Sequence, residues 1–213
     1  MADFEEMVKV GQQHGIDFML DMVLNHCSIE HEWFQKALAG DSYYQDFFIL
    51  RDEPTDWLSK FGGSAWAPFG DTGKYYLHLY DVTQADLNWR NPNVRQELFK
   101  VVNFWRDKGV KGFRFDVINV IGKDEVLTDC PEQEGKPAYT DKPIVHDYLR
   151  MMNEATFGQD DSVMTVGEMS ATTIENCILY TAPDRQELSM AFNFHHLKVD
   201  YEAGQKWTLK AFD

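Results

Sequence analysis

The 213-residue sequence has few cysteines and no long apolar run. Its three cysteines, Cys27, Cys130 and Cys177, lie far apart and outside any CxxC pair, so their spacing indicates neither a disulfide framework nor a zinc site. The sequence contains no run of roughly 18 apolar residues, so we predict no membrane-spanning helix. The segment MADFEEMVKV is acidic where a signal peptide would be basic and then apolar. These absences predict a cytoplasmic protein.

Positive charge is also scarce. The chain carries 20 Lys and Arg against 35 Asp and Glu, a net charge of −15, which repels polyanions and argues against nucleic acid and anionic membranes as partners. We find no internal repeat and no low-complexity tract. Aromatic residues make up 14% of the sequence, a content that hints at aromatic-lined or carbohydrate-facing surfaces.

What the sequence does contain is an alternation of helical and strand patterns. We predict helices at residues 3–14, 91–108, 146–155 and 173–180, and apolar strands at 16–24, 110–117, 162–169 and 188–197. Asp3 is the expected cap of the first helix, and Asn91 with Pro92 begins the second. Strict alternation with short loops predicts a parallel α/β sheet whose strands are buried on both faces. The pattern does not decide between an open sheet and a closed barrel.

The alternation is interrupted once. Residues 27–90 are rich in Trp, Tyr, Phe, Gly and Asp and show no sustained period, which predicts an inserted subdomain or an elaborate loop that carries substrate contacts. We therefore divide the chain into 1–26, an inserted region at 27–90, and 91–213. A further loop is expected at 128–142.

Polar residues mark the ends of the predicted strands. Arg114 and Asp116 are two residues apart on one strand and so point to the same face. On these two residues alone, a structural ion pair is as good an interpretation as a catalytic one. However, the preceding strand also ends in polar residues, Asp21, Asn25 and His26. Ligands of parallel α/β proteins bind at the edge formed by the carboxyl ends of the strands.

Glu168 ends the following strand and supplies a second carboxylate. Two carboxylates on neighbouring strand ends can stand about 5 Å apart, the separation found in retaining glycosidases. Asp116 beside an arginine is suited to remain ionised and attack, whereas Glu168 must begin protonated. The apolar residues Met164, Val166 and Met169 are expected to help raise the pKa of Glu168.

Three of these segments resemble the signature regions of one family. DMVLNH at 21–26, GFRFDV at 112–117 and VGEM at 166–169 resemble regions of glycoside hydrolase family 13, the alpha-amylase family. The insertion at 27–90 is similar to that family's domain B. The resemblance implies a (β/α)8 barrel of which this chain supplies about strands three to six. The seventh strand, with a third carboxylate and a sugar-binding histidine, is then expected to be missing, and the isolated chain to be inactive.

The resemblance also implies roles for the strand-end residues. Asp116 would form the covalent glycosyl-enzyme and Glu168 would protonate the leaving oxygen, while His26 and Arg114 would bind the sugar. Asp21 and Asn25 would support the site. The residue that corresponds to Asn25 helps to bind calcium in some amylases, but this branch generally does not use that site. We therefore expect no metal, and we assign no cofactor.

Longer strings narrow the resemblance to one branch. KFGGSAW at 60–66, YYLHLY at 75–80 and ADLNWRNP at 85–92 are similar to oligo-1,6-glucosidases and trehalose-6-phosphate hydrolases, and the segment 187–201 is most similar to the latter. The implied substrate is a phosphorylated disaccharide, trehalose 6-phosphate, cleaved to glucose and glucose 6-phosphate. An oligo-1,6-glucosidase is the near alternative. A non-catalytic barrel scaffold and a truncated product without function of its own are the more distant ones.

Other candidates have simpler interpretations. His26 and His31 lack the spacing of a metal-binding motif, and of the adjacent His195 and His196 only one can reach a site. Lys198 is a candidate phosphate contact, although most lysines are merely solvated. The aromatic cluster is more economically explained as core than as a sugar platform; it comprises Trp33, Phe34, Tyr43, Tyr44, Phe47 and Phe48.

Overall fold

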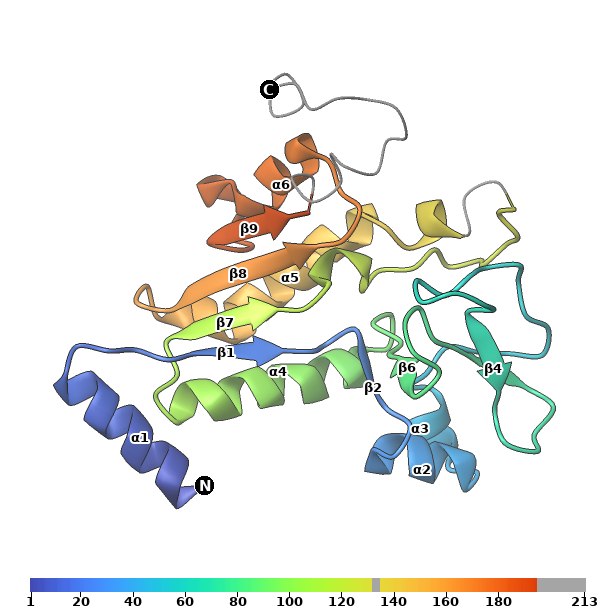
Figure 1. Ribbon diagram of the computed structural model, residues 1–213, viewed down its shortest axis with the longest axis horizontal. Coiled ribbons are helices and arrows are strands. Elements are labelled where there is room, and N and C mark those ends of the chain that lie inside the picture. The colour runs from blue at the N-terminus through green and yellow to red at the C-terminus, as the bar shows by residue number, and fades with distance from the viewer. Residues whose placement is uncertain (132–134, 195–213) are drawn as a thin grey trace.

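The computed structural model describes residues 1–131 and 135–194. Four parallel strands form its main sheet in the order β1-β7-β8-β9 (Figure 1). Their bounds are Met19–Met22 for β1, Gly112–Phe115 for β7, Met164–Met169 for β8 and Met190–Asn193 for β9. Each parallel pair is separated along the chain by at least one helix, so the predicted α/β alternation is confirmed.

The four predicted helices are present with small shifts of their ends. They are α1 (Ala2–Gln13), α4 (Pro92–Asp107), α5 (Pro143–Ala155) and α6 (Ile174–Thr181). Asn91 caps α4, because its side chain accepts a hydrogen bond of 2.9 Å from the Asn93 amide. The prediction that Asp3 caps α1 was wrong: the cap position is Met1 and Asp3 lies inside the first turn. Within the described residues, no helix combines the length and apolarity needed to cross a membrane.

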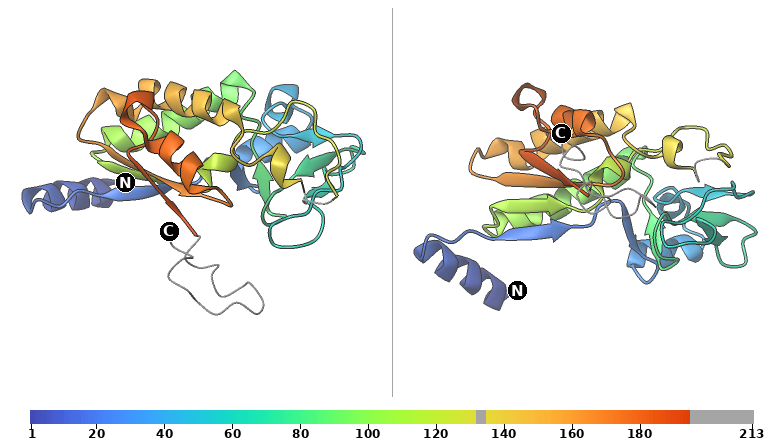
Figure 2. Two further views of the ribbon diagram at one scale, coloured as in Figure 1. Left: turned by 90° about the horizontal axis from the view of Figure 1, so that it is seen from above. Right: turned by 45° about the horizontal axis from the view of Figure 1, so that its top comes forward.

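Helices cover only one face of the sheet. Figure 2 shows α4 and α5 on the same side of the strands. The strand residues on that side are largely removed from solvent; they include Met22, Phe113, Phe115, Thr165 and Met169. On the other face Met19, Met164, Met190 and Phe192 are all more than a third exposed. The prediction of strands buried on both faces was therefore wrong, because in the described chain no helix covers the second face, although Glu168 on that face is only 8% exposed.

The inserted region builds two small antiparallel sheets beside the end of the main one. One pairs β2 (His26–Ser28) with β6 (Gln84–Asp86), and the other has the order β3-β5-β4, from Leu50–Arg51, Tyr75–Leu77 and Trp66–Pro68. Two short helices, α2 (Glu32–Leu38) and α3 (Ser42–Gln45), lie between β2 and β3 in the chain. Phe34, Phe47 and Phe48 are buried in the main core, which confirms the core interpretation for half of the aromatic cluster.

A second hydrophobic core joins the inserted region to the long loop after β7. In this core Trp57 packs against Tyr139, with ring centroids 5.6 Å apart, and the Trp57 indole donates a hydrogen bond of 2.9 Å to the carbonyl of Thr128. The loop contains two 3-10 turns, η1 (Ile118–Val120) and η2 (Lys136–Ala138); two more, η3 (Phe157–Gln159) and η4 (Pro183–Arg185), follow later in the chain. The described residues of the loop predicted at 128–142 thus pack against the inserted region.

Candidate active site

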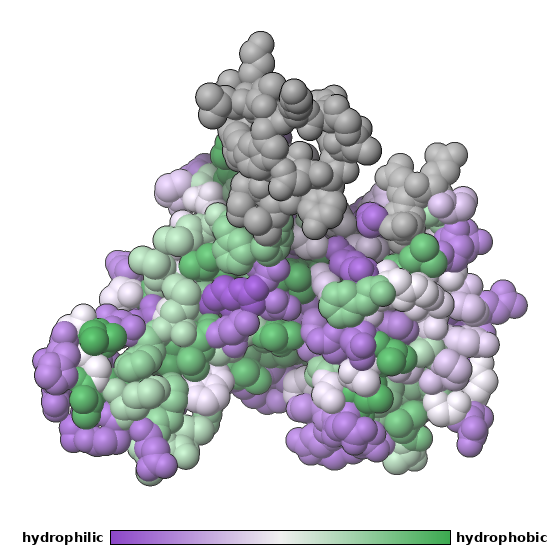
Figure 3. All heavy atoms as spheres, viewed as in Figure 1, coloured by the Kyte–Doolittle hydropathy of each residue, from purple (hydrophilic) through white to green (hydrophobic). Residues whose placement is uncertain are grey.

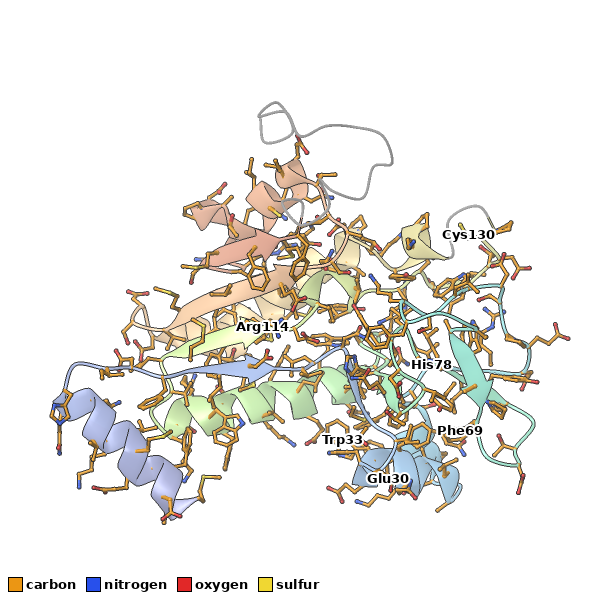
Figure 4. All side chains as sticks on the ribbon, viewed as in Figure 1. Glu30, Trp33, Phe69, His78, Arg114 and Cys130 are labelled. Carbon is orange, nitrogen blue, oxygen red and sulfur yellow. The ribbon has the colours of Figure 1, made fainter. Side chains whose placement is uncertain are left out.

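Arg114 lies at the centre of the site and contacts three carboxylates. It projects from the open face of β7 (Figure 4), where its Nη1 lies 2.6 and 2.7 Å from the two oxygens of Asp21 and 2.8 Å from Oδ1 of Asp116. Its Nη2 contacts Oε2 of Glu168. Burial opposes the charged guanidinium, but the carboxylates of Asp21 and Asp116 more than offset it and raise the pKa of Arg114.

This arrangement follows from strand geometry. Residues two apart on a strand share a face, and the parallel register places Asp21 opposite Arg114, which in turn lies opposite Val166. Glu168 is two residues beyond Val166 and so points to the same face. Because a guanidinium is a small planar fork, carboxylates bound to its two terminal nitrogens are held close to each other.

Asp116 and Glu168 also line one cavity of about 720 Å³ between the main sheet and the inserted region. His26 lies in the same wall, and Trp33, Phe61 and Tyr80 contribute aromatic surface. Phe61 is 71% exposed, so its ring is free to cover a ligand. The cavity therefore combines two carboxylates with flat apolar surfaces, which is the combination that a sugar ring requires.

His26 is held in a defined position at the wall of the cavity. It is only 6% exposed, its Nδ1 lies 3.3 Å from Nδ2 of Asn25, and its ring lies 5.4 Å from that of Tyr80. Burial lowers the pKa of His26, although Asp86 and Asp116 oppose this effect. A neutral imidazole is the favoured form, and it is able to hydrogen-bond a sugar hydroxyl without adding charge.

A buried cation lies behind His26. The ammonium of Lys123 donates a hydrogen bond of 2.7 Å to Oδ1 of Asn25 and lies 2.8 Å from Oδ2 of Asp86, while Nδ2 of Asn25 also bonds Oδ2 of Asp86 at 3.0 Å. Burial lowers the pKa of Lys123, and the Asp86 carboxylate counteracts it. Asn25 thus holds the chain next to His26 in place through its hydrogen bond with Lys123. Sequence reasoning missed Lys123 and Asp86, since no local pattern distinguishes them.

The backbone directly after Asp116 is strained. Val117 has φ +40° and ψ +39°, a left-handed conformation that is costly for a β-branched residue. The turn is held on both sides, because the amide of Asp116 donates a hydrogen bond of 3.0 Å to the carbonyl of Met22, and Val120 donates one of 3.1 Å to the carbonyl of Val117. The chain leaves β7 sharply and aims the Asp116 carboxylate into the cavity.

Four of the residues singled out in the sequence meet at the cavity: His26, Asp116 and Glu168 line it and Arg114 bonds two of them. Asp21 reaches the site only through Arg114. His31 also lines the cavity, and its Nδ1 accepts a hydrogen bond from the Trp33 amide at the start of α2. In the described part of the chain, no group of three or more His, Cys, Asp or Glu side chains is arranged to hold a metal ion.

Two sequence expectations about the site are changed or left open. Glu168 was expected to have apolar surroundings, but Met164 is 48% exposed and the closest polar partner of Glu168 is the Arg114 cation. The cause is again the uncovered face of the sheet. His195, His196 and Lys198 lie outside the described residues.

The comparison with known families is decisive at this point. All of residues 1–213 match the catalytic domain of the alpha-amylase family. The chain belongs to this family. Because the family's solved members are (β/α)8 barrels, the four-stranded sheet of this alpha-amylase family chain is part of such a barrel.

Individual relatives agree with the family assignment. Trehalose-6-phosphate hydrolase from Bacillus subtilis is 51% identical over all of this chain, and oligo-1,6-glucosidase from Parageobacillus thermoglucosidasius is 43% identical over 99% of it; each match spans 39% of the relative. The crystal structure of trehalose-6-phosphate hydrolase from Bacillus licheniformis superposes with a TM-score of 0.92 at 52% identity, over 98% of this chain and 39% of the other. The chain therefore spans about two fifths of these proteins.

Proposed function

We propose that this chain carries the nucleophile and the acid/base of a retaining α-glycosidase that hydrolyses trehalose 6-phosphate. The observation on which the proposal rests is that Asp116 and Glu168 bind one guanidinium and face one cavity. Two carboxylates this close suit a double displacement better than direct attack by water, which needs a wider gap. We further propose that residues 27–90 form a domain B-like insertion that contributes substrate contacts, because Phe61 and Tyr80 of this region line the cavity.

In the first step an oxygen of Asp116 attacks the anomeric carbon while Glu168 gives its proton to the departing sugar oxygen. The C–O bond to the leaving group breaks as the ester to Asp116 forms. In the second step Glu168 removes a proton from water, which attacks the same carbon and frees Asp116. Protonation of Glu168 before the first step requires its ion pair with Arg114 to open. We propose that the sugar separates the two side chains when it binds.

Other chain features support the roles of the remaining residues. His26, neutral and buried at the cavity wall, is assigned to a sugar hydroxyl, and Arg114 orients the Asp116 carboxylate through a charge-assisted hydrogen bond. Asp21 and Asn25 act through Arg114 and His26. Lys198 stays our candidate for the phosphate of the leaving glucose 6-phosphate. The assigned substrate and product are small sugars of carbohydrate metabolism, and this assignment favours a cytoplasmic enzyme.

The choice of substrate rests on similarity. The two relatives above differ in what their names say they cleave, and this chain is more similar to the phosphate-specific one, at 51% against 43% identity. Oligo-1,6-glucosidase activity is the second candidate, because both types of enzyme resemble the chain along nearly its whole length. A comparison of rates on trehalose 6-phosphate and isomaltose separates the two.

The test uses a completed barrel, in which this chain replaces the matching segment of the Bacillus subtilis enzyme. We expect glucose release from trehalose 6-phosphate to exceed that from isomaltose at least tenfold, and a ring-fluorinated glucosyl fluoride to lose its anomeric fluoride and add one fluoroglucosyl mass to the peptide that contains Asp116. Asp116→Asn should abolish both signals. A label on any other residue contradicts the assigned nucleophile, and a preference for isomaltose contradicts the substrate.

The chain by itself provides the complementary measurement. Without the third carboxylate that the family resemblance implies, we expect no detectable glucose from trehalose 6-phosphate or from an aryl α-glucoside. Turnover by the isolated chain would show that Asp116 and Glu168 suffice, and would overturn the need for the remaining strands.

A further inference from the structure

Asn119 is fully buried three residues after Asp116, and the proposed chemistry does not use it. Its side-chain amide pairs with the backbone of Ser170, two residues after Glu168. Oδ1 of Asn119 accepts a hydrogen bond of 2.8 Å from the amide of Ser170, and Nδ2 donates one of 2.8 Å to the carbonyl of Ser170. One side chain thus replaces the two backbone bonds that a neighbouring strand would have made at this position.

Asp141 fixes the orientation of that amide. Its Oδ1 accepts a hydrogen bond of 2.9 Å from Nδ2 of Asn119, and a carboxylate has no proton to donate when ionised. A flipped amide would therefore place two acceptors against each other. The Asp141 carboxylate is itself held by Tyr180 at 3.0 Å and by Asn176 at 2.9 Å. The amide of Asp141 also donates to the carbonyl of Asn119 at 3.0 Å.

Backbone strain gathers around this cluster. In the described chain, four residues other than glycine have a positive φ, and three of them adjoin Asn119 or its partners: Val117 at +40°, Asp141 at +49° and Ala171 at +52°. Such conformations persist only where the surroundings hold them. Ala171 directly follows Ser170, so the pair of bonds from Asn119 holds the strained turn that comes immediately after the Glu168 strand.

The inserted region reaches the same turn. Nζ of Lys60 donates a hydrogen bond of 2.6 Å to Oγ of Ser170 and lies 5.7 Å from the ring centre of Tyr80, which lines the cavity. Ser170 is therefore bonded from η1, the turn that follows β7, through its backbone, and from the inserted region through its side chain. The turn after Glu168 is built as a junction between the two parts of the chain.

We propose that Asn119 is a positioning residue for Glu168. By clamping both backbone groups of Ser170, it fixes the strand end from which the Glu168 carboxyl faces the cavity, at a set distance from Asp116 on its own strand. The inference depends on the proposed function for its kinetic consequence but not for its structural one. Asn119 acts through the backbone and does not touch the sugar.

The structural consequence is measured on the chain as it is, by hydrogen–deuterium exchange. In Asn119→Ala and Asn119→Asp we expect exchange in residues 169–172 to rise at least tenfold while peptides from α4 keep their protection. Asn103→Ala, which removes a hydrogen bond of 3.1 Å to the carbonyl of Ala155 on the far helical layer, is the matched control and should leave 169–172 unchanged. Unchanged exchange there in both Asn119 variants would overturn the proposal.

The kinetic consequence is measured on the completed barrel with two leaving groups. A displaced acid matters only where the leaving oxygen needs a proton, so Asn119→Asp should lower kcat/KM for trehalose 6-phosphate about 100-fold and for 2,4-dinitrophenyl α-glucoside less than threefold. Equal losses on both substrates would mean a merely structural role and sink the proposal. If the unsubstituted barrel cleaves neither substrate, the proposed function fails, and the exchange experiment still decides whether Asn119 positions the turn.

Discussion

At the scale of single residues, the site is organised by buried polar groups that satisfy one another. Arg114 is the partner of three carboxylates, and Lys123 neutralises Asp86 away from solvent. An isolated charge at the buried positions of Lys123 and Asp86 would be prohibitively costly. The carboxylates of Asp116 and Glu168 are therefore placed by one cation, Arg114, which Asp21 holds in turn.

His26 should make stability depend on pH. Its pKa is lowered by burial from 6.5, so below that pH the unfolded chain binds a proton more readily than the folded one. The stabilisation is present above pH 6.5 and is lost as the pH falls through the folded pKa, with a slope of at most about 1.4 kcal/mol per pH unit. Urea unfolding between pH 7.5 and 5 should show this slope, and His26→Gln should reduce it.

The exposed His14 supplies the control for that experiment. His14→Gln should leave the pH dependence as it is in the unsubstituted chain. Parallel curves for the unsubstituted chain and His26→Gln would contradict the assignment of the slope to His26.

Removing the Lys123 ammonium should strongly lower the free energy of unfolding, because Lys123 is the buried partner of Asp86. Lys123→Met leaves Asp86 charged and buried, and breaking a buried pair in this way costs about 3 to 5 kcal/mol. Adding Asp86→Asn removes the stranded charge and should recover part of the loss, because an asparagine oxygen still accepts from the amide of Leu79. Urea unfolding of both single variants and the double variant gives the coupling free energy between Lys123 and Asp86. Purely additive losses of stability would contradict the prediction that the two side chains stabilise each other.

At the scale of elements, the sequence predicted most of the main sheet and little of what joins it to the insertion. Apolar runs between capped helices located β1, β7 and β8, and the strand-end rule brought Asp116 and Glu168 together. The sequence did not predict the role of Lys123, because its partner Asn25 is 98 residues away in the chain. For the same reason the 51-residue separation between Asn119 and Ser170 leaves no local signal.

The second hydrophobic core also depends on contacts between distant segments that the sequence did not predict. Its contact between Gly135 and Trp57 can be tested by substitution. Gly135 has φ +82°, and a Cβ at this position would lie 2.3 Å from the Trp57 ring. Gly135→Ala is therefore both strained and in steric conflict with a rigid indole, and should undock the loop from the inserted region at a cost of about 2 kcal/mol or more. Faster limited proteolysis between residues 120 and 142 would report the undocking.

Gly73→Ala separates the two contributions. Gly73 also has a positive φ, +77°, but nothing lies within 4 Å of its added Cβ. Gly73→Ala should lose stability through backbone strain alone and should leave cleavage of the 120–142 loop unchanged. If Gly135→Ala proved no worse than Gly73→Ala, the docking of the loop against Trp57 would be in doubt.

At the scale of the whole molecule, the main sheet has one covered face and one open face. Figure 3 looks onto the open face, where apolar and polar side chains lie side by side. Met19, Met164 and Met190 are 43%, 48% and 41% exposed there, in positions that in a closed barrel would point into a packed interior. Strands β1 and β9 are the edges of the described sheet and present unpaired backbone groups.

The isolated chain should therefore self-associate through its open face, in spite of a net charge of −15. Sedimentation velocity at increasing concentration should show oligomers, because apolar area and free strand edges favour pairing. Met164→Lys with Met190→Lys places two charges in the row and should shift the chain toward the monomer. Val82→Lys, an equally exposed residue of the inserted region at 49%, should not. A monomer at every concentration would contradict the prediction that the open face and its strand edges drive association.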